Sequence, residues 1–202
     1  MRIHFSNLFF VTALIAAGTL QLPAGAATPR PPTAPETTSA PSRDARLDTL
    51  FAKLKHQANA DAAKQTADAI QSIWRHSGSP TIDLLMEWSS KAISDKHYAT
   101  ALDLLDQVTM LEPEYAEGWN QRAAVHFLMS DYAKSMADID KTLSLEPRHF
   151  GALSGMATIF KALGKDRLAM DVLEKVLAIY PADHDAQQRL GDLADELAGE
   201  SI

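Results

Sequence analysis

Residues 116–149 read AEGWNQRAAVHFLMSDYAKSMADIDKTLSLEPRH, a stretch of 34 residues whose pattern recurs on both sides of it. Two columns of residues show the spacing most clearly: Pro113, Pro147 and Pro181, and Leu85, Trp119 and Leu153. Inside the stretch, the apolar residues follow the 3.6-residue spacing of two successive helices. A fixed period of this length indicates stacked copies of one helix–turn–helix unit.

The break between the two helices of this unit falls at Ser130 and Asp131. Their side-chain oxygens can accept hydrogen bonds from the first N–H groups of the second helix. Pro147 cannot continue that helix, so the unit ends there. We expect Trp119 to be buried between the two helices of its repeat and the preceding repeat, because its column is apolar throughout. Two small residues are expected where the helices cross: Ala123 and Ser135.

The unit resembles a tetratricopeptide repeat (TPR), a family that prefers certain residue types along its 34 positions. The matching positions here are Trp119, Ala123, His126, Ser135, Ile139, Thr142 and Pro147. Three units match without gaps: residues 82–115, 116–149 and 150–183. Arg122 departs from the usual Leu, and His126 departs from the usual Tyr. The resemblance implies an all-α fold, a right-handed α-solenoid of helix–turn–helix repeats with terminal capping helices.

The N-terminal 27 residues have the pattern of a secretory signal peptide. Arg2 precedes an uncharged run from Leu8 to Leu20, and small residues follow up to Ala27. The alternative is a membrane anchor, but this run is short for a bilayer span of ~20 residues. We therefore expect cleavage, no membrane insertion afterwards, and a periplasmic location. A signal peptide followed by such repeats resembles the small exported TPR proteins of Gram-negative bacteria.

Three segments flank the repeats. Residues 28–43 are rich in Pro and Thr and are expected to be a disordered linker, although such a segment could also be a ligand for a Pro-binding groove. Residues 44–81 are expected to form a helix pair, either a decayed repeat or a cap on the apolar face of the first full repeat. Residues 184–202 are expected to form a capping helix and tail.

Composition excludes several classes of function. The chain has 202 residues, 46% of them hydrophobic, a net charge of −7 and no Cys. An acidic chain offers no basic surface for nucleic acid, so we expect no nucleic-acid partner. Without Cys there is no disulfide, no thiolate metal site, no Cys nucleophile and no lipid-attachment Cys.

No group of residues has the spacing of a catalytic or metal site. No two His residues are three or four apart on a helix, and the nearest cluster, 183–185, falls at a repeat junction where a solvated turn is expected. Acids such as Asp138 are expected on exposed helix faces beside cations such as Lys141. The sequence has no phosphate loop and no nucleophile elbow. We therefore expect no enzyme activity, no cofactor and no metal.

What remains is a binding surface, which the resemblance places on the first helix of each repeat. Asn120 and Phe127 share one face of the middle repeat, and Ser90 and Thr158 lie on the flanking helices. We expect these four residues to contact a protein or peptide partner. Some TPR domains clamp a C-terminal carboxylate with Lys, Arg and Asn. Asn120 fits that pattern, but the Lys partners are missing.

The sequence thus predicts a non-catalytic scaffold or adaptor that binds a protein or peptide of the cell envelope. The alternative is a structural or assembly role, in which the solenoid associates with copies of itself or packs into a larger envelope complex.

Overall fold

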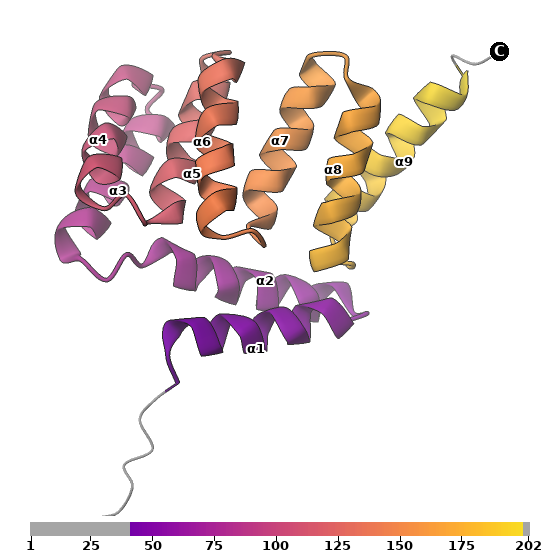
Figure 1. Cartoon of the computed structure of the whole chain (residues 1–202), viewed down its shortest axis with the longest axis horizontal. Helices are drawn as coiled ribbons and strands as arrows, with labels where there is room; N and C mark the ends of the chain where they lie inside the picture. Colours follow the sequence, from indigo (N-terminus) through magenta and orange to yellow (C-terminus); the bar gives the residue numbers. More distant parts are fainter. Residues whose placement is uncertain (1–40, 200–202) are drawn as a thin grey trace, which may run out of the picture. The chain divides into compact units, whose positions relative to one another are not determined.

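The computed structural model describes residues 41–199, and every regular element in that range is a helix (Figure 1). The helices of this range are α1 (Arg43–His56), α2 (Ala60–Arg75), α3 (Pro80–Ser94), α4 (Tyr98–Leu111), α5 (Ala116–Leu128), α6 (Tyr132–Leu145), α7 (Phe150–Ala162), α8 (Asp166–Ile179) and α9 (His184–Gly199). The predicted all-α fold is confirmed. The signal peptide expected at 1–27, and all but the end of the linker at 28–43, lie outside the described residues.

Helices α3 to α8 form three successive pairs, and each pair packs against the next (Figure 1). Helix α9 packs against α8 and follows the last pair. The three small residues of one repeat column are all buried: Ala101, Ser135 and Ala169. The Ser135 hydroxyl also donates to the carbonyl oxygen of Ala123, 2.8 Å away on the paired helix. Small side chains therefore allow the two helices of a pair to approach closely.

The turn between α5 and α6 follows the prediction from the sequence. Asp131 caps α6 by accepting a hydrogen bond from the backbone N–H of Lys134. Ser130 adopts a φ of 61°, which closes the turn. Helix α6 ends at Leu145, two residues before Pro147, because a proline cannot supply the next backbone N–H.

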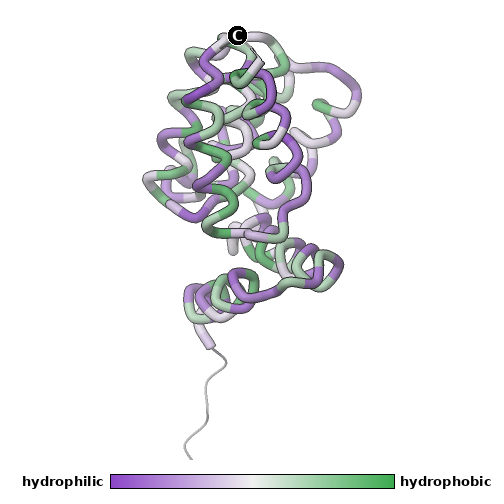
Figure 2. Tube along the Cα trace, turned by 90° about the vertical axis from the view of Figure 1, so that its right-hand side faces the viewer, coloured by the Kyte–Doolittle hydropathy of each residue, from purple (hydrophilic) through white to green (hydrophobic). Residues whose placement is uncertain are grey.

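The apolar core runs through the stack because each helix buries one face. Figure 2 shows hydrophobic and hydrophilic residues alternating along the helices, as expected for an amphipathic helix in a layered fold. One cluster joins α3, α4 and α5, a second joins α5, α6 and α7, and the largest joins α1, α2, α7, α8 and α9.

The α1–α2 pair packs against α5, α7 and α8. Trp74 of α2 stacks on His149, with ring centroids 4.2 Å apart, and it also contacts Phe150. The Tyr115 hydroxyl donates to the carbonyl oxygen of Arg75 at 2.9 Å, and burial raises the pKa of Tyr115. The sequence suggested that this pair would cover the first full repeat. Its aromatic residues are instead buried against the second and third repeats.

Trp119 is only partly buried, so the prediction that it would be buried between the helices of its repeat and the preceding repeat is wrong. Its indole N–H donates to the carbonyl oxygen of Pro113 at 2.9 Å, and the Arg122 guanidinium lies over the ring, 4.6 Å from its centroid. Arg122 stands where the family usually has Leu, and its side chain is 19% exposed. The guanidinium of Arg122 therefore covers one face of the indole.

Trp119→Ala is expected to lower the free energy of unfolding by only ~1–2 kcal/mol, because partial burial and one cation–π contact are lost. Leu153 occupies the same repeat position one unit later and is buried, so Leu153→Ala should cost ~2–5 kcal/mol. Urea unfolding followed by circular dichroism compares the two variants. Equal losses would contradict this account of Trp119.

Within residues 41–199, no helix combines the length and the apolar character needed to cross a bilayer.

Candidate functional site

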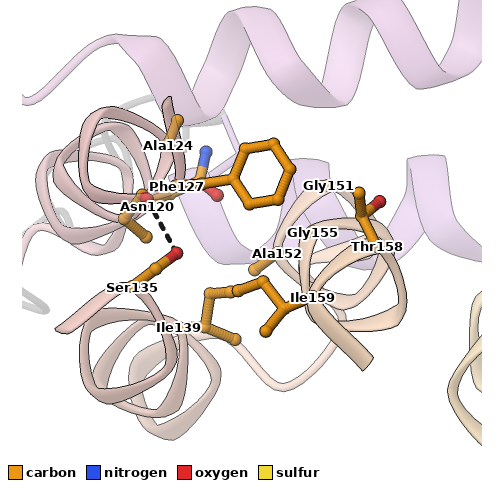
Figure 3. Close-up of a pocket in the computed structure, with 11 residues that line it drawn as sticks. Asn120, Ala124, Phe127, Ser135, Ile139, Gly151, Ala152, Gly155, Thr158 and Ile159 are labelled. Atoms are coloured by element: carbon orange, nitrogen blue, oxygen red, sulfur yellow. Dashed lines mark hydrogen bonds between the residues drawn. The ribbon is translucent and has the colours of Figure 1, made fainter. Parts of the chain in front are cut away.

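A pocket of about 140 Å³ opens between α5, α6 and α7 (Figure 3). It lies where the first helices of two successive repeats run beside each other, with the second helix of the middle repeat behind them. Its lining consists of Asn120, Ala123, Ala124, Phe127, Ser135, Ile139, Gly151, Ala152, Gly155, Thr158 and Ile159. Most of this surface is apolar, and none of the lining residues carries a charge.

Two glycines on α7 help to keep the pocket open. A Cβ built on Gly155 would lie 3.6 Å from the Cδ1 atom of Ile139, which is ordinary van der Waals contact. Gly151 lies one turn earlier on the same helix. Because these positions have no side chains, the space in front of Ile139 and Ile159 stays empty, while Phe127 forms the facing wall (Figure 3).

The polar groups of the lining differ in how many hydrogen bonds they make. The Thr158 hydroxyl donates to the carbonyl oxygen of Ser154 and accepts from Arg189, and Ser135 donates to Ala123. The Asn120 Nδ2 group donates to Glu117 Oε2 at 3.2 Å. Among the described residues, no donor contacts the Oδ1 atom of Asn120. Asn120 therefore keeps a free acceptor at the pocket.

The orientation of the Asn120 amide is set by a chain of contacts. The backbone N–H of Ala152 donates to Nδ1 of His149 at 3.1 Å, so the ring proton must be on Nε2. That proton is donated to Glu117 Oε2 at 3.0 Å. A carboxylate only accepts, so the NH₂ group of Asn120 must face Glu117 and its oxygen must face away. Stacking of Trp74 on His149 connects this chain to α2.

The structure brings together three of the four residues that the sequence singled out. Asn120, Phe127 and Thr158 all line the pocket. Ser90 does not: it is exposed on α3, its hydroxyl 2.9 Å from the carbonyl oxygen of Met86 and 3.4 Å from Gln121 Oε1. A role in binding stays a prediction for all four. Phe127 also contacts Tyr132, with centroids 5.7 Å apart.

Other lining residues were missed by the sequence analysis, which considered only one face of the first helix of each repeat. Ile139 comes from α6, and its place in an apolar repeat column was the available signal. Gly155 could have been found from its spacing of four after Gly151.

A second polar cluster joins α4, α5 and α6. Arg122 makes two hydrogen bonds to the carboxylate of Asp138, at 2.9 and 2.7 Å, and one each to Asp106 and Thr109. The bonds to Asp138 raise the pKa of the guanidinium. His126 is buried, with Nε2 3.8 Å from Asp138. These groups face one another and not a cavity.

Asp138 is a correction to the sequence analysis, which placed it on an exposed face beside Lys141. It is almost fully buried and pairs with Arg122, while Lys141 lies 3.6 Å from Glu114. A buried acid needs a partner, and the departure from Leu at position 122 supplies it.

The cluster at residues 183–185 has structural contacts. Asp183 accepts from the backbone N–H of Ala186 at 3.1 Å, and Asp185 pairs with Arg189. Within the part of the chain that the structure describes, no group of three or more His, Asp or Glu residues could hold a metal ion.

Comparison with known proteins finds proteins that carry tetratricopeptide repeats. No family model matches the chain. A TPR repeat-containing protein of Rhizobium etli is 51% identical over 154 residues, which are 76% of each chain. The first TPR domain of Spaghetti (RPAP3), solved with the HSP90 peptide SRMEEVD, has 23% identity and a TM-score of 0.56, over 59% of this chain and 95% of that one. The crystal structure of MamA has 15% identity and a TM-score of 0.53, over 76% of this chain and 81% of that one.

Proposed function

Because the chain belongs to the tetratricopeptide repeat family, we propose that it binds a peptide segment of another protein in the pocket between α5, α6 and α7. The pocket contains no carboxylate, imidazole or amine, so it offers no acid or base for a reaction. A non-catalytic scaffold or adaptor is the function that it supports.

The proposal rests on one observation: the pocket between α5, α6 and α7 is uncharged and has a free hydrogen-bond acceptor, the Oδ1 atom of Asn120, at its edge. A cavity of ~150 Å³ can hold a benzene molecule, so this pocket of about 140 Å³ suits a single Leu, Met or Phe side chain. The Oδ1 atom of Asn120 can accept a hydrogen bond from a backbone N–H of the same peptide. The side chain would anchor the peptide, and the amide would fix its position.

The relatives support peptide binding but not one particular peptide. The first TPR domain of Spaghetti holds the acidic peptide SRMEEVD in its solved structure. In our chain no Lys or Arg lines the pocket, so it cannot neutralise a carboxylate there. We propose that the partner contributes an apolar side chain and not a C-terminal acid.

The partner belongs, in this proposal, to the cell envelope. The uncharged run from Leu8 to Leu20 and the small residues up to Ala27 support export, and the absence of Cys argues against a lipid-anchored form. Fractionation of cells that produce the full chain, followed by N-terminal sequencing, tests this location. A cytoplasmic protein that still starts at Met1 would contradict it.

Filling the pocket should abolish peptide binding without unfolding the protein. Peptides are first selected on the wild-type protein from a random-sequence library, and their affinities are measured by fluorescence anisotropy. We expect Gly155→Leu to weaken binding at least ~30-fold, because its side chain occupies the space of the anchor. Phe127→Ala should also weaken it, since one wall is lost.

The matched control is Gly191→Leu, since Gly191 also lies within a helix, has open space around it and does not line the pocket. Both glycine variants should keep full helicity, and only Gly155→Leu should lose the peptide. The acidic peptide SRMEEVD should bind neither the wild type nor the variants. Selected peptides that bind Gly155→Leu as well as the wild type would place the site elsewhere.

A further inference from the structure

Two large apolar side chains lie exposed on one face of α3. Leu84 is 42% exposed and Trp88 is 51% exposed, one turn apart. Thr81, Lys91 and Asp95 continue the same line along the helix. We call this surface, Thr81, Leu84, Trp88, Lys91 and Asp95, the α3 end face. Neighbouring exposed apolar side chains of this kind are typical of protein–protein interaction sites.

The repeat register shows what this face is. The positions that correspond to Leu84 and Trp88 in the next repeat are Gly118 and Arg122, and both lie against α4. A Cβ on Gly118 would come within 2.7 Å of Val108, and Arg122 donates to Thr109. The α3 end face is therefore the surface through which a repeat packs on the repeat before it.

The α3 end face stays open because no preceding repeat is stacked on it. The α1–α2 pair is buried against α5, α7 and α8 instead. The opposite end of the stack is different, since the free side of α9 carries exposed polar residues: Gln188, Asp192 and Asp195. Among the described residues, the α9 end of the stack therefore has the polar surface that a solenoid end needs, and the α3 end does not.

We propose that the α3 end face binds the same face of a second copy of this chain, with the two α3 helices antiparallel about a twofold axis. Head-to-tail stacking is disfavoured, because it would set Leu84 and Trp88 against the polar, acidic side of α9. The symmetric arrangement covers both apolar side chains of each copy with those of the other. It also continues the packing surface used between repeats inside the chain.

The charges beside Trp88 suit this arrangement. In an antiparallel pair, the N-terminal half of one α3 lies beside the C-terminal half of the other, so Glu87 of one copy approaches Lys91 of the second copy. Glu87 pairs with no cation among residues 41–199, and Lys91 has only an exposed contact with Asp95 within its own helix. The twofold axis therefore forms this complementary contact twice.

Sedimentation equilibrium of the chain from residue 28 onward, over a concentration series, tests the proposal. We expect a reversible monomer–dimer equilibrium. Trp88→Arg should raise the dimer dissociation constant at least about tenfold, since a buried Trp is a typical interface anchor. Arginine already occupies the corresponding position 122, so the helix tolerates it. Leu163→Gln is the control, because Leu163 is similarly exposed, at 47%, on the turn between α7 and α8.

A charge exchange separates a twofold dimer from any other contact of this face. Lys91→Glu should weaken the dimer, because two acids then meet. Adding Glu87→Lys to that variant exchanges the two signs and should restore the dimer to near its original dissociation constant. A monomer at every concentration, a dimer insensitive to Trp88→Arg, or no recovery in the double variant would overturn the proposal.

Discussion

Replacing Arg122 with Met should lower the free energy of unfolding by ~3–5 kcal/mol, although Met is the residue that the next repeat has at this position. The reason is Asp138, whose side chain is only 6% exposed and which accepts two hydrogen bonds from Arg122. Without the guanidinium, the carboxylate of Asp138 is left in the core with only His126, 3.8 Å away, near enough to balance it. Urea unfolding followed by circular dichroism measures the loss.

The double variant makes this prediction specific. In the next repeat the positions of Arg122 and Asp138 hold Met156 and Val172, which contribute to the apolar core. Arg122→Met with Asp138→Val should recover to within ~1–1.5 kcal/mol of the wild type, because an apolar pair can replace a buried ion pair. Asp68→Ala, which removes an exposed pair with Lys64, should cost less than ~1 kcal/mol. Additive losses in the double variant would show that Arg122 and Asp138 do not depend on each other.

Trp74→Ala should cost ~3–5 kcal/mol and detach the α1–α2 pair from the repeats. Trp74 is buried, stacks on His149 at 4.2 Å and contacts Phe51 and Phe150. These contacts join α2 to α1 and α7, so their loss leaves the helix pair without its central anchor. Amide hydrogen exchange should become faster in α1 and α2 first, ahead of the exchange in α5 and α6.

Trp74→Phe is the matched variant. The indole N–H of Trp74 is buried and has no hydrogen-bond partner among the described residues, so its removal forfeits no bond. A phenyl ring retains most of the stacking, and the cost should fall to ~1 kcal/mol or less. Two results would contradict this account: amide exchange in α1–α2 of Trp74→Phe that is as fast as in Trp74→Ala, or exchange in Trp74→Ala that is no faster than in the wild type.

The repeat spacing was enough to predict the helices, their turns and three of the pocket residues. Asn120, Phe127 and Thr158 lie together because helical spacing fixes which side of α5 or α7 a residue occupies. Ser90 belongs to the first repeat and therefore does not line the pocket, which lies between the second and third repeats. Spacing alone cannot say which pair of repeats leaves an opening, because that depends on side-chain volume at positions such as Gly155.

Two features could not be predicted from a repeat pattern. Asp138 has the spacing of an exposed acid, and only the contact with Arg122 from another helix explains its burial. The α1–α2 pair lacks the repeat signature, so no register determined where it would pack. Its position follows from Trp74 and its contacts with His149 and Phe150, which lie more than seventy residues later in the chain.

Chemical-shift mapping with a selected peptide tests the central claim, that the pocket between α5, α6 and α7 is the binding site. Backbone amide spectra of the isotope-labelled protein are recorded with and without the peptide. The account predicts that the largest changes fall on Asn120, Ala124 and Phe127 of α5 and on Gly151 and Gly155 of α7, with little change in α3. Changes concentrated on α1–α2, or on the α3 end face, with α5 and α7 unaffected, would contradict it.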